Sequence, residues 1–170
     1  VINIRITDHV NSFSNFTPLQ SAYRKYRSTE TALLHIQNDI LLAIDRRQVT
    51  ALVLLDLSAA FDTVDHAILL ERLQCWFGIT GSALGLLSNY LSLRTQSVLI
   101  NGVSSSSLPV HTGVPQGSVL GPVLFTLYTT PIADLIGQHG LSYHLYADDT
   151  QIYVSFAASD APASLKSLFS

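Results

Sequence analysis

The protein has 170 residues, of which 48% are hydrophobic and 12% are charged, a composition that supports the buried core of one domain or part of one and argues against disorder. Its net charge of −3 argues against a module that holds nucleic acid by bulk electrostatics alone. Acidic and basic residues interrupt the richest apolar stretch, so we expect no membrane span, and the single Cys75 excludes an internal disulfide framework. The chain begins at Val1 without any methionine, and we interpret it as a piece of a longer protein.

The first helix is predicted well inside the chain. Residues 1–20 are rich in turn-forming types, which predicts an irregular entry segment. Residues 32–44 then space apolar side chains along one helix face. Ser28 with Thr31, or Thr29, is positioned to cap this helix.

A strand and two helices follow. Residues 50–57 are a short apolar run with an aspartate near its end, typical of a central strand that is buried on both faces. The pattern from Asp65 to Gly78 predicts one helix, and the pattern over residues 82–91 predicts a second. Two helices should therefore come directly after the strand.

Two hairpins are predicted. The Asn-Gly pair at residues 101–102 follows the strand-like residues 96–100, and this pair accepts the positive φ values of a tight turn. Residues 141–156 alternate as a second hairpin, with the Asp-Asp pair at 148–149 in its turn. The second hairpin therefore carries acidic groups at its tip.

A loop and a helix lie between the hairpins. Residues 113–121 form a loop rich in glycine and proline, which leads into a helix over residues 122–136. Pro131 is expected to bend or shorten that helix. The small, polar tail is expected to begin another helix near residues 165–169.

The candidate chemistry is carried by carboxylates. Asp56 lies at a strand end and Asp148 and Asp149 at a hairpin tip, so neighbouring strands would bring the three together. Crowded carboxylates repel one another unless a cation neutralises them, and hard oxygen ligands suit Mg²⁺ or Mn²⁺. Taken singly, each has a simpler interpretation as a helix cap or a turn residue.

Three segments resemble the palm motifs of reverse transcriptases, in the order in which that family carries them. They are Leu54-Leu55-Asp56-Leu57-Ser58-Ala59-Ala60-Phe61-Asp62, Gly113-Val114-Pro115-Gln116-Gly117-Ser118-Val119-Leu120-Gly121-Pro122 and Tyr146-Ala147-Asp148-Asp149. The extended loop resembles the non-LTR (LINE-type) retrotransposon branch. Gln20-Ser21-Ala22-Tyr23-Arg24 is similar to the fingers motif of the family, with Ala-Tyr where the family usually has Gly-Phe.

The resemblance implies an α+β fold. Its core would be a polymerase palm with a small antiparallel sheet backed by helices, together with partial fingers and without a thumb. Residues 1–50 would be the partial fingers segment, and residues 51–170 the palm, truncated before the thumb.

The resemblance also implies the metal site. Asp56 and Asp148 would ligate two Mg²⁺ or Mn²⁺ ions, with Asp149 contributing charge or weaker ligation and the backbone carbonyl of Leu57 helping. Two such ions clamp the attacking and leaving oxygens of an in-line phosphoryl displacement.

The same resemblance assigns the substrate contacts. Phe61 would exclude ribonucleotides by a clash with the 2′-hydroxyl, although an aromatic residue after a strand is more often part of the core. Gln116 and Gly117 would pack beside the incoming nucleotide and the template base. Arg24 would hold the triphosphate, while His66 and His111 are expected to take no part.

The function implied is that of an RNA-directed DNA polymerase core, which joins deoxynucleotides to a primer 3′-hydroxyl. Its partners would be an RNA template, a DNA primer, deoxynucleoside triphosphates and the rest of a polyprotein with a thumb and an endonuclease domain. The alternative is a catalytically inactive remnant or nucleic-acid-binding fragment. A small-molecule phosphotransfer site is a third interpretation, and it leaves the loop at residues 113–121 unexplained.

Overall fold

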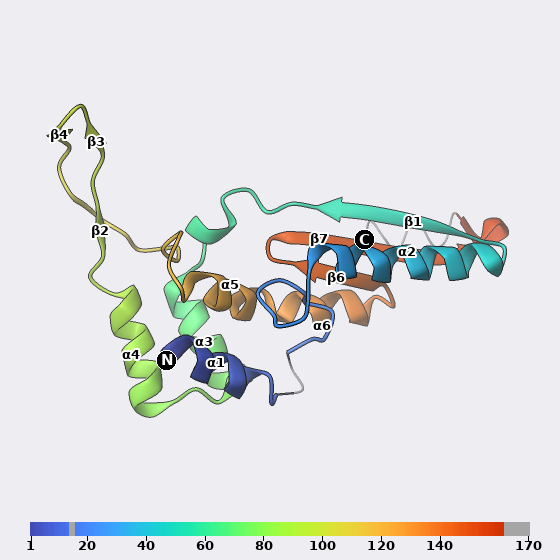
Figure 1. The fold of residues 1–170 in the computed structure, drawn as a ribbon, viewed down its shortest axis with the longest axis horizontal. Coiled ribbons are helices and arrows are strands. Elements are labelled where there is room, and N and C mark those ends of the chain that lie inside the picture. Colours follow the sequence, from blue (N-terminus) through green and yellow to red (C-terminus); the bar gives the residue numbers. More distant parts are fainter. Residues whose placement is uncertain (14–15, 162–170) are drawn as a thin grey trace. The chain divides into compact units, whose positions relative to one another are not determined.

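The computed structural model describes residues 1–13 and 16–161, which combine helices with small antiparallel sheets (Figure 1). This confirms the predicted α+β class. The chain divides into two compact units, one made of residues 1–15 and 59–128 and the other of residues 16–58 and 129–170. Within the described residues, no helix has the length and apolar character that crossing a membrane requires.

In the second unit, helix α2 (Thr29–Asp45) packs along the sheet. Its predicted start is confirmed, because the Ser28 hydroxyl accepts a hydrogen bond from the Thr31 backbone N–H and the Thr31 hydroxyl accepts one from the Ser28 N–H. This capping box satisfies two backbone donors. Ala32, Ile36 and Ala43 form its buried face.

The sheet of the second unit has three antiparallel strands in the order β1 (Gln48–Leu55), β7 (Asp149–Ala157) and β6 (Ser142–Tyr146). Leu145, Tyr153 and Phe156 are its buried hydrophobic residues. Helix α6 (Pro131–Gln138) contacts β6, and the short 3₁₀ helix η2 (Ala158–Asp160) follows β7.

The prediction of a central strand buried on both faces was wrong for β1. Among the described residues this strand pairs with β7 alone and is the outer strand of the sheet, with Leu54 70% exposed (Figure 1). A continuous apolar run reports β propensity and hydrophobicity, but it does not report how many strands or helices cover it. The strand itself and its acidic exit are as predicted.

In the first unit, helix α3 (His66–Phe77) packs against helix α4 (Gly81–Leu91). Both were predicted. The Asp65 carboxylate caps α3 by accepting from the Ile68 N–H, and Gly78 ends the helix at φ 61°. Leu69, Leu73 and Phe77 of α3 are fully buried.

Residues 1–20 are not irregular throughout, so that prediction was wrong in part. Helix α1 spans Ile2–Val10, and Val10 is buried. Ile2, Ile6 and Val10 recur every four residues and supply the apolar face that drives helix formation. The turn-forming residues begin only at Asn11, after the helix.

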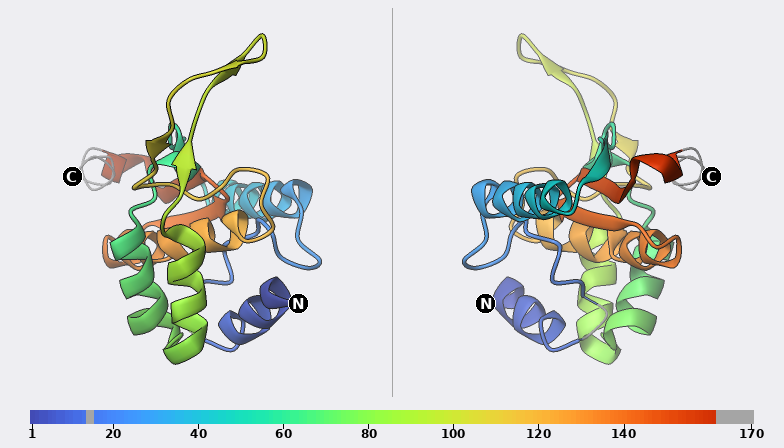
Figure 2. Two further views of the ribbon diagram at one scale, coloured as in Figure 1. Left: turned by 90° about the vertical axis from the view of Figure 1, so that its left-hand side faces the viewer. Right: turned by 90° about the vertical axis from the view of Figure 1, so that its right-hand side faces the viewer.

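The hairpin predicted at the Asn-Gly pair is confirmed. Strands β3 (Leu99–Ile100) and β4 (Val103–Ser104) flank the turn, and β2 (Thr95–Gln96) pairs with β5 (Leu108–Pro109) further down. The hairpin extends away from α3 and α4 of its own unit (Figure 2). We call residues 95–109 the exposed arm.

The predicted effect of Pro131 is also confirmed. The apolar stretch forms two helices, α5 (Gly121–Thr129) and α6, and Pro131 is the first residue of α6. Proline lacks the N–H that would continue the α5 hydrogen-bond ladder, but it fits the first turn of a new helix. The helix expected near residues 165–169 lies outside the described residues.

Candidate active site

Two of the three predicted carboxylates meet at one end of the sheet. The β1–β7 register pairs Leu55 with Thr150, so the next residues along, Asp56 and Asp149, lie opposite each other. Both line a cavity of about 370 Å³, which also has Leu54 and Gln151 in its wall. Both aspartates are exposed, so solvent and solutes reach their carboxylates.

The third carboxylate lies in the adjoining turn. Tyr146 pairs with Asp149, which leaves Ala147 and Asp148 as the two-residue turn between β6 and β7. The turn was expected at the Asp-Asp pair itself and lies one residue earlier, because Asp149 already belongs to β7. Buried Leu145 and Thr150 pair across the two strands and set this register.

Asp148 has a phenol for a neighbour. Burial raises the pKa of the Tyr23 hydroxyl, and the negative charge of Asp148 and the nearby Tyr146 raise it further. Tyr23 is half exposed and has φ 57°, an uncommon value for an aromatic residue. The segment that resembles the fingers motif therefore lies beside the acidic turn within the second unit.

The three carboxylates are oxygen donors that could hold a divalent cation. No group of three His, Cys, Asp or Glu side chains among the described residues is arranged to hold a metal ion. In polymerase sites, however, Mg²⁺ is held by one or two carboxylates together with substrate phosphates and water. Asp56 and Asp149 line one cavity and Asp148 directly precedes Asp149, so their carboxylates are oxygen donors of the type that such an ion takes.

Arg24 lies on the same segment as Tyr23. Its Nη1 donates to the Thr17 carbonyl at 2.8 Å and to the Gln20 carbonyl at 3.3 Å, and the guanidinium lies over the Phe16 ring at 4.5 Å. Burial lowers the pKa of Arg24, and the nearby charge of Arg27 lowers it further. These contacts fix the guanidinium relative to residues 16–20.

The glycine-rich loop belongs to the first unit, where it is held against the 3₁₀ turn η1 (Ala60–Asp62). The Gly113 N–H donates to the Val64 carbonyl and the Val114 N–H to the Phe61 carbonyl, both at 2.7 Å. Gly113 has φ 91°, and a Cβ there would meet the backbone of Asp62 at 3.0 Å. Only glycine fits this approach of two backbones.

The predicted substrate residues of the first unit have defined partners. The Phe61 ring stacks on Phe125 with a centroid separation of 4.8 Å. The Gln116 side-chain N–H₂ donates to both Asp62 carboxylate oxygens at 3.3 Å. Gly117 has φ 76° and open space around it, so a backbone surface is accessible there.

Three residues hold parts of the candidate site in place, although the sequence did not predict these roles. The His66 Nε2 donates to the Gly113 carbonyl at 2.7 Å, so His66 anchors the loop although it was expected to take no part. Asp62 orients Gln116, and its place in the first palm-like motif was the available signal. Gln20 contacts the acidic turn, and no local pattern announces that contact.

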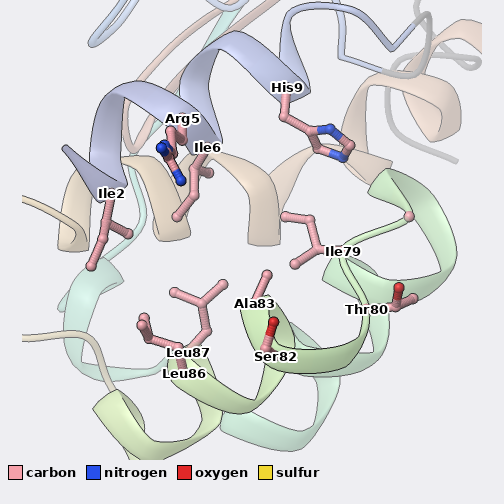
Figure 3. A pocket seen from close by; sticks show the side chains of 11 residues that line it. Ile2, Arg5, Ile6, His9, Ile79, Thr80, Ser82, Ala83, Leu86 and Leu87 are labelled. Carbon is pink, nitrogen blue, oxygen red and sulfur yellow. The ribbon is translucent and has the colours of Figure 1, made fainter.

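A larger cavity of about 540 Å³ lies elsewhere in the first unit, between α1 and the α3–α4 turn. Ile6, Ile79 and Leu87 point into it (Figure 3). The His9 Nε2 at its edge donates to the Phe77 carbonyl at the end of α3. None of the predicted catalytic or substrate residues lines this cavity.

An acidic sheet end with a glycine-rich loop in the same chain is the combination that the reverse transcriptase resemblance requires. A family model described as "Reverse transcriptase (RNA-dependent DNA polymerase)" matches residues 1–170. The chain therefore belongs to the reverse transcriptase family, which confirms the resemblance.

Similar proteins come from retrotransposons. The chain is 31% identical over 139 residues to the RNA-directed DNA polymerase from mobile element jockey of Drosophila melanogaster, covering 78% of this chain and 15% of that protein. It is 29% identical over 143 residues to the Pol polyprotein from type-1 retrotransposable element R2 of Popillia japonica, covering 78% of this chain and 20% of that protein. The chain thus spans a fifth or less of the length of these relatives.

Among solved structures, a chain of the partial Cas6-RT-Cas1–Cas2 complex is 25% identical and covers 77% of this chain and 21% of its own length, with a TM-score of 0.38. This score is too low to add detail to the fold.

Proposed function

We propose that this domain is the polymerase core of a non-LTR retrotransposon protein that copies RNA into DNA. The observation that carries the proposal is the sheet register, which sets Asp56 opposite Asp149 at an exposed cavity with Asp148 in the adjoining turn. Membership in the reverse transcriptase family supports the reaction type. The reaction is attack of a primer 3′-hydroxyl on the α-phosphorus of a deoxynucleoside triphosphate, with release of pyrophosphate.

The acidic residues would hold the divalent cations. Asp56 and Asp148, with Asp149 and the Leu57 carbonyl, would bind two Mg²⁺ or Mn²⁺ ions, which would supply Lewis-acid stabilisation of the phosphoryl oxygens when bound. The chain itself contributes position: β1 and the β6–β7 turn set where the carboxylates lie before substrate arrives. Because the charged groups are already in position, the reaction does not require the free energy of rearranging them.

Phe61 is proposed as the residue that selects deoxynucleotides. Its stacking on Phe125, with ring centroids 4.8 Å apart, favours one orientation of the ring and supports its role as a wall against a 2′-hydroxyl. Steric exclusion of one hydroxyl needs a rigid wall, because a mobile side chain would simply make room. The partly exposed position of Phe61 leaves one side of the residue available to a ligand.

Gln116 and Gly117 are proposed to contact the incoming nucleotide and the template base. The bond from Gln116 to Asp62 holds the amide in one orientation, and Gly117 permits close approach of its backbone. Arg24 is proposed to bind the triphosphate, since a guanidinium matches phosphate oxygens and the contact with the Phe16 ring limits its motion.

The finer architecture is also proposed. Residues 1–50 would be the partial fingers segment and residues 51–170 the palm. RNA template, DNA primer and deoxynucleoside triphosphates would be the substrates, and the rest of a longer polyprotein would supply a thumb and an endonuclease domain. The relatives are named as an RNA-directed DNA polymerase and a Pol polyprotein, which supports the reaction type and the longer polyprotein.

The decisive experiment is primer extension on an RNA template with Mg²⁺, using the complete parent polypeptide. Asp56→Asn should lower extension by about 10³-fold, because several kcal/mol of charge stabilisation would be lost. Asp45→Asn, an exposed aspartate at the end of α2 in the same unit, is the matched control and should leave extension unchanged. An inactive parent protein would favour the non-catalytic remnant instead.

A second experiment addresses Phe61. Phe61→Ala should raise the use of ribonucleotides relative to deoxynucleotides by about 10²-fold in kcat/KM, since the wall that excludes the hydroxyl is removed. Phe61→Tyr keeps the ring and should keep the preference. Unchanged discrimination by the alanine variant would remove Phe61 from the site.

A further inference from the structure

The side chain of Gln20 is buried beside the acidic turn. It is 2% exposed, and its Oε1 accepts a hydrogen bond from the Ala22 N–H at 2.9 Å and another from the Ala147 N–H at 3.3 Å. Since both partners are backbone donors, the atom that they share must be the amide oxygen. One oxygen therefore connects residues 20–22 to the turn that carries Asp148.

Both connections end at strained backbone. Ala147 has φ 56° and directly precedes Asp148, and Tyr23, with φ 57°, directly follows Ala22. Residues other than glycine, asparagine and aspartate adopt such values only where the surrounding structure holds them. Neither an Asn nor a Gly is present in the Ala147-Asp148 turn to favour it locally. The turn thus depends on contacts from outside its own hairpin.

The rest of the segment is fixed to β6. The Ser21 N–H donates to the Leu145 carbonyl and the Leu145 N–H to the Leu19 carbonyl, which is a parallel bridge at Gln20. The buried Ser21 hydroxyl also hydrogen-bonds the His144 Nε2 at 2.9 Å. These bonds place the Gln20 side chain at the C-terminal end of β6, beside the turn that Ala147 and Asp148 form.

We propose that Gln20 is a positioning residue that holds Asp148 in its reactive place by bonding the Ala147 N–H. The proposal rests on the function proposed above. Gln20 touches neither substrate nor cation in this role: it acts through the backbone of Ala147. Loss of its oxygen frees the turn to relax from positive φ, and the Asp148 carboxylate moves with it.

The test replaces Gln20 in the complete parent polypeptide. Gln20→Met keeps length and volume but removes the acceptor, and it should lower kcat by about 10²-fold with a smaller change in the KM for the nucleotide. Gln20→Glu keeps an acceptor oxygen and should retain more activity than the methionine variant. Gln37→Ala, at an exposed position of α2, is the control and should match the parent.

Hydrogen exchange separates this proposal from the polymerase assignment. The Ala147 amide should exchange faster in Gln20→Met than in the parent, with the α2 amides unchanged, whether or not the protein polymerises. A parent without activity but with this faster exchange would overturn the polymerase function and support the contact. Unchanged exchange at Ala147, or equal kcat in the methionine variant and an active parent, would overturn the positioning role.

Discussion

Among the described residues, two tight hairpins have two-residue turns of different backbone conformation. The β3–β4 turn uses Asn101 and Gly102, at φ 49° and 82°, which are residue types that accept these values. The β6–β7 turn uses Ala147 at φ 56°, which no local preference favours. The first hairpin lies on the exposed arm, with Leu99 70% exposed, whereas the second packs buried residues in its own unit.

The difference shows where the chain departs from local rules. The Asn-Gly turn folds from its own sequence, and no predicted catalytic residue lies in it. The Ala147-Asp148 turn is held from outside by Gln20, and it carries a predicted catalytic carboxylate. Strain that the surrounding structure maintains is typical of functional sites. The two hairpins can therefore be compared by mutating the residues of each turn.

The largest contrast is expected from exchanging Asp and Asn between the turns. Asp148→Asn should lower RNA-templated primer extension by about 10³-fold while leaving the thermal unfolding temperature unchanged or slightly raised, because one of three crowded negative charges is removed. Asn101→Asp should change neither quantity, since aspartate also tolerates positive φ. Primer-extension rates measure the activity, and calorimetry measures the thermal unfolding temperature.

Equal loss of activity in these two variants would contradict the comparison. It would mean that the exposed arm contributes to catalysis as much as the acidic turn.

The next contrast concerns two glycines with positive φ. Gly113→Ala should destabilise the fold by roughly 3 kcal/mol, because strain at φ 91° adds to a backbone clash at 3.0 Å with Asp62. Gly102→Ala, with φ 82° and open space, should cost about 1 kcal/mol. Each kcal/mol corresponds to roughly 2–4 °C in Tm for a chain of this size. Equal shifts in Tm would show that the loop yields to the added methyl group.

Of the two hairpins, only the β6–β7 hairpin should make the stability of the fold depend on pH. Burial lowers the pKa of His144 on β6, the charges of His35 and Arg27 lower it further, and Asp39 opposes them. The His144 imidazole is therefore protonated more readily in the unfolded chain than in the folded chain. The contribution of His144 to the free energy of unfolding should be fully present above the ordinary histidine pKa of about 6.5 and should decrease as the pH drops below it. The β3–β4 hairpin, residues 99–104, carries no ionisable side chain.

Chemical denaturation between pH 8 and pH 5 measures this dependence. His144→Gln keeps a side chain that can hydrogen-bond the Ser21 hydroxyl, but it does not titrate, so this variant should flatten the curve. A curve that keeps its slope in this variant would assign the effect to other groups.

Local signals in the sequence predicted most of the fold. The Ser28 capping box, the Asp65 and Gly78 ends of α3 and the Asn-Gly turn follow from side chains within a few residues of each element. Helix α1 was missed because only four apolar residues mark it, next to a turn-rich stretch. The outer position of β1 was missed because strand order depends on distant pairing.

The candidate site was predictable in part. The motifs selected the three aspartates, and the register that ends at Leu55 and Thr150 leads to Asp56 and Asp149 as the next residues of the two chain segments. Gln20 and His66 hold the turn and the loop across 127 and 47 residues of sequence, and such pairings leave no periodic signal. The roles assigned to the three aspartates, and to the substrate-binding residues Phe61, Gln116, Gly117, Arg24 and Leu57, stay predictions.

The smallest effect is expected from Asn101→Ala on the exposed arm. Alanine at φ 49° should destabilise the β3–β4 hairpin by about 1 kcal/mol, because alanine lacks the side-chain hydrogen bonding that lets asparagine adopt positive φ. This change makes the turn resemble Ala147-Asp148 in strain but without an outside acceptor such as Gln20. Amide exchange at residues 99–104 should therefore accelerate while primer extension remains at the parent rate. A fall in extension would assign the arm a part in binding template or primer, and the separation between a structural and a catalytic hairpin would fail.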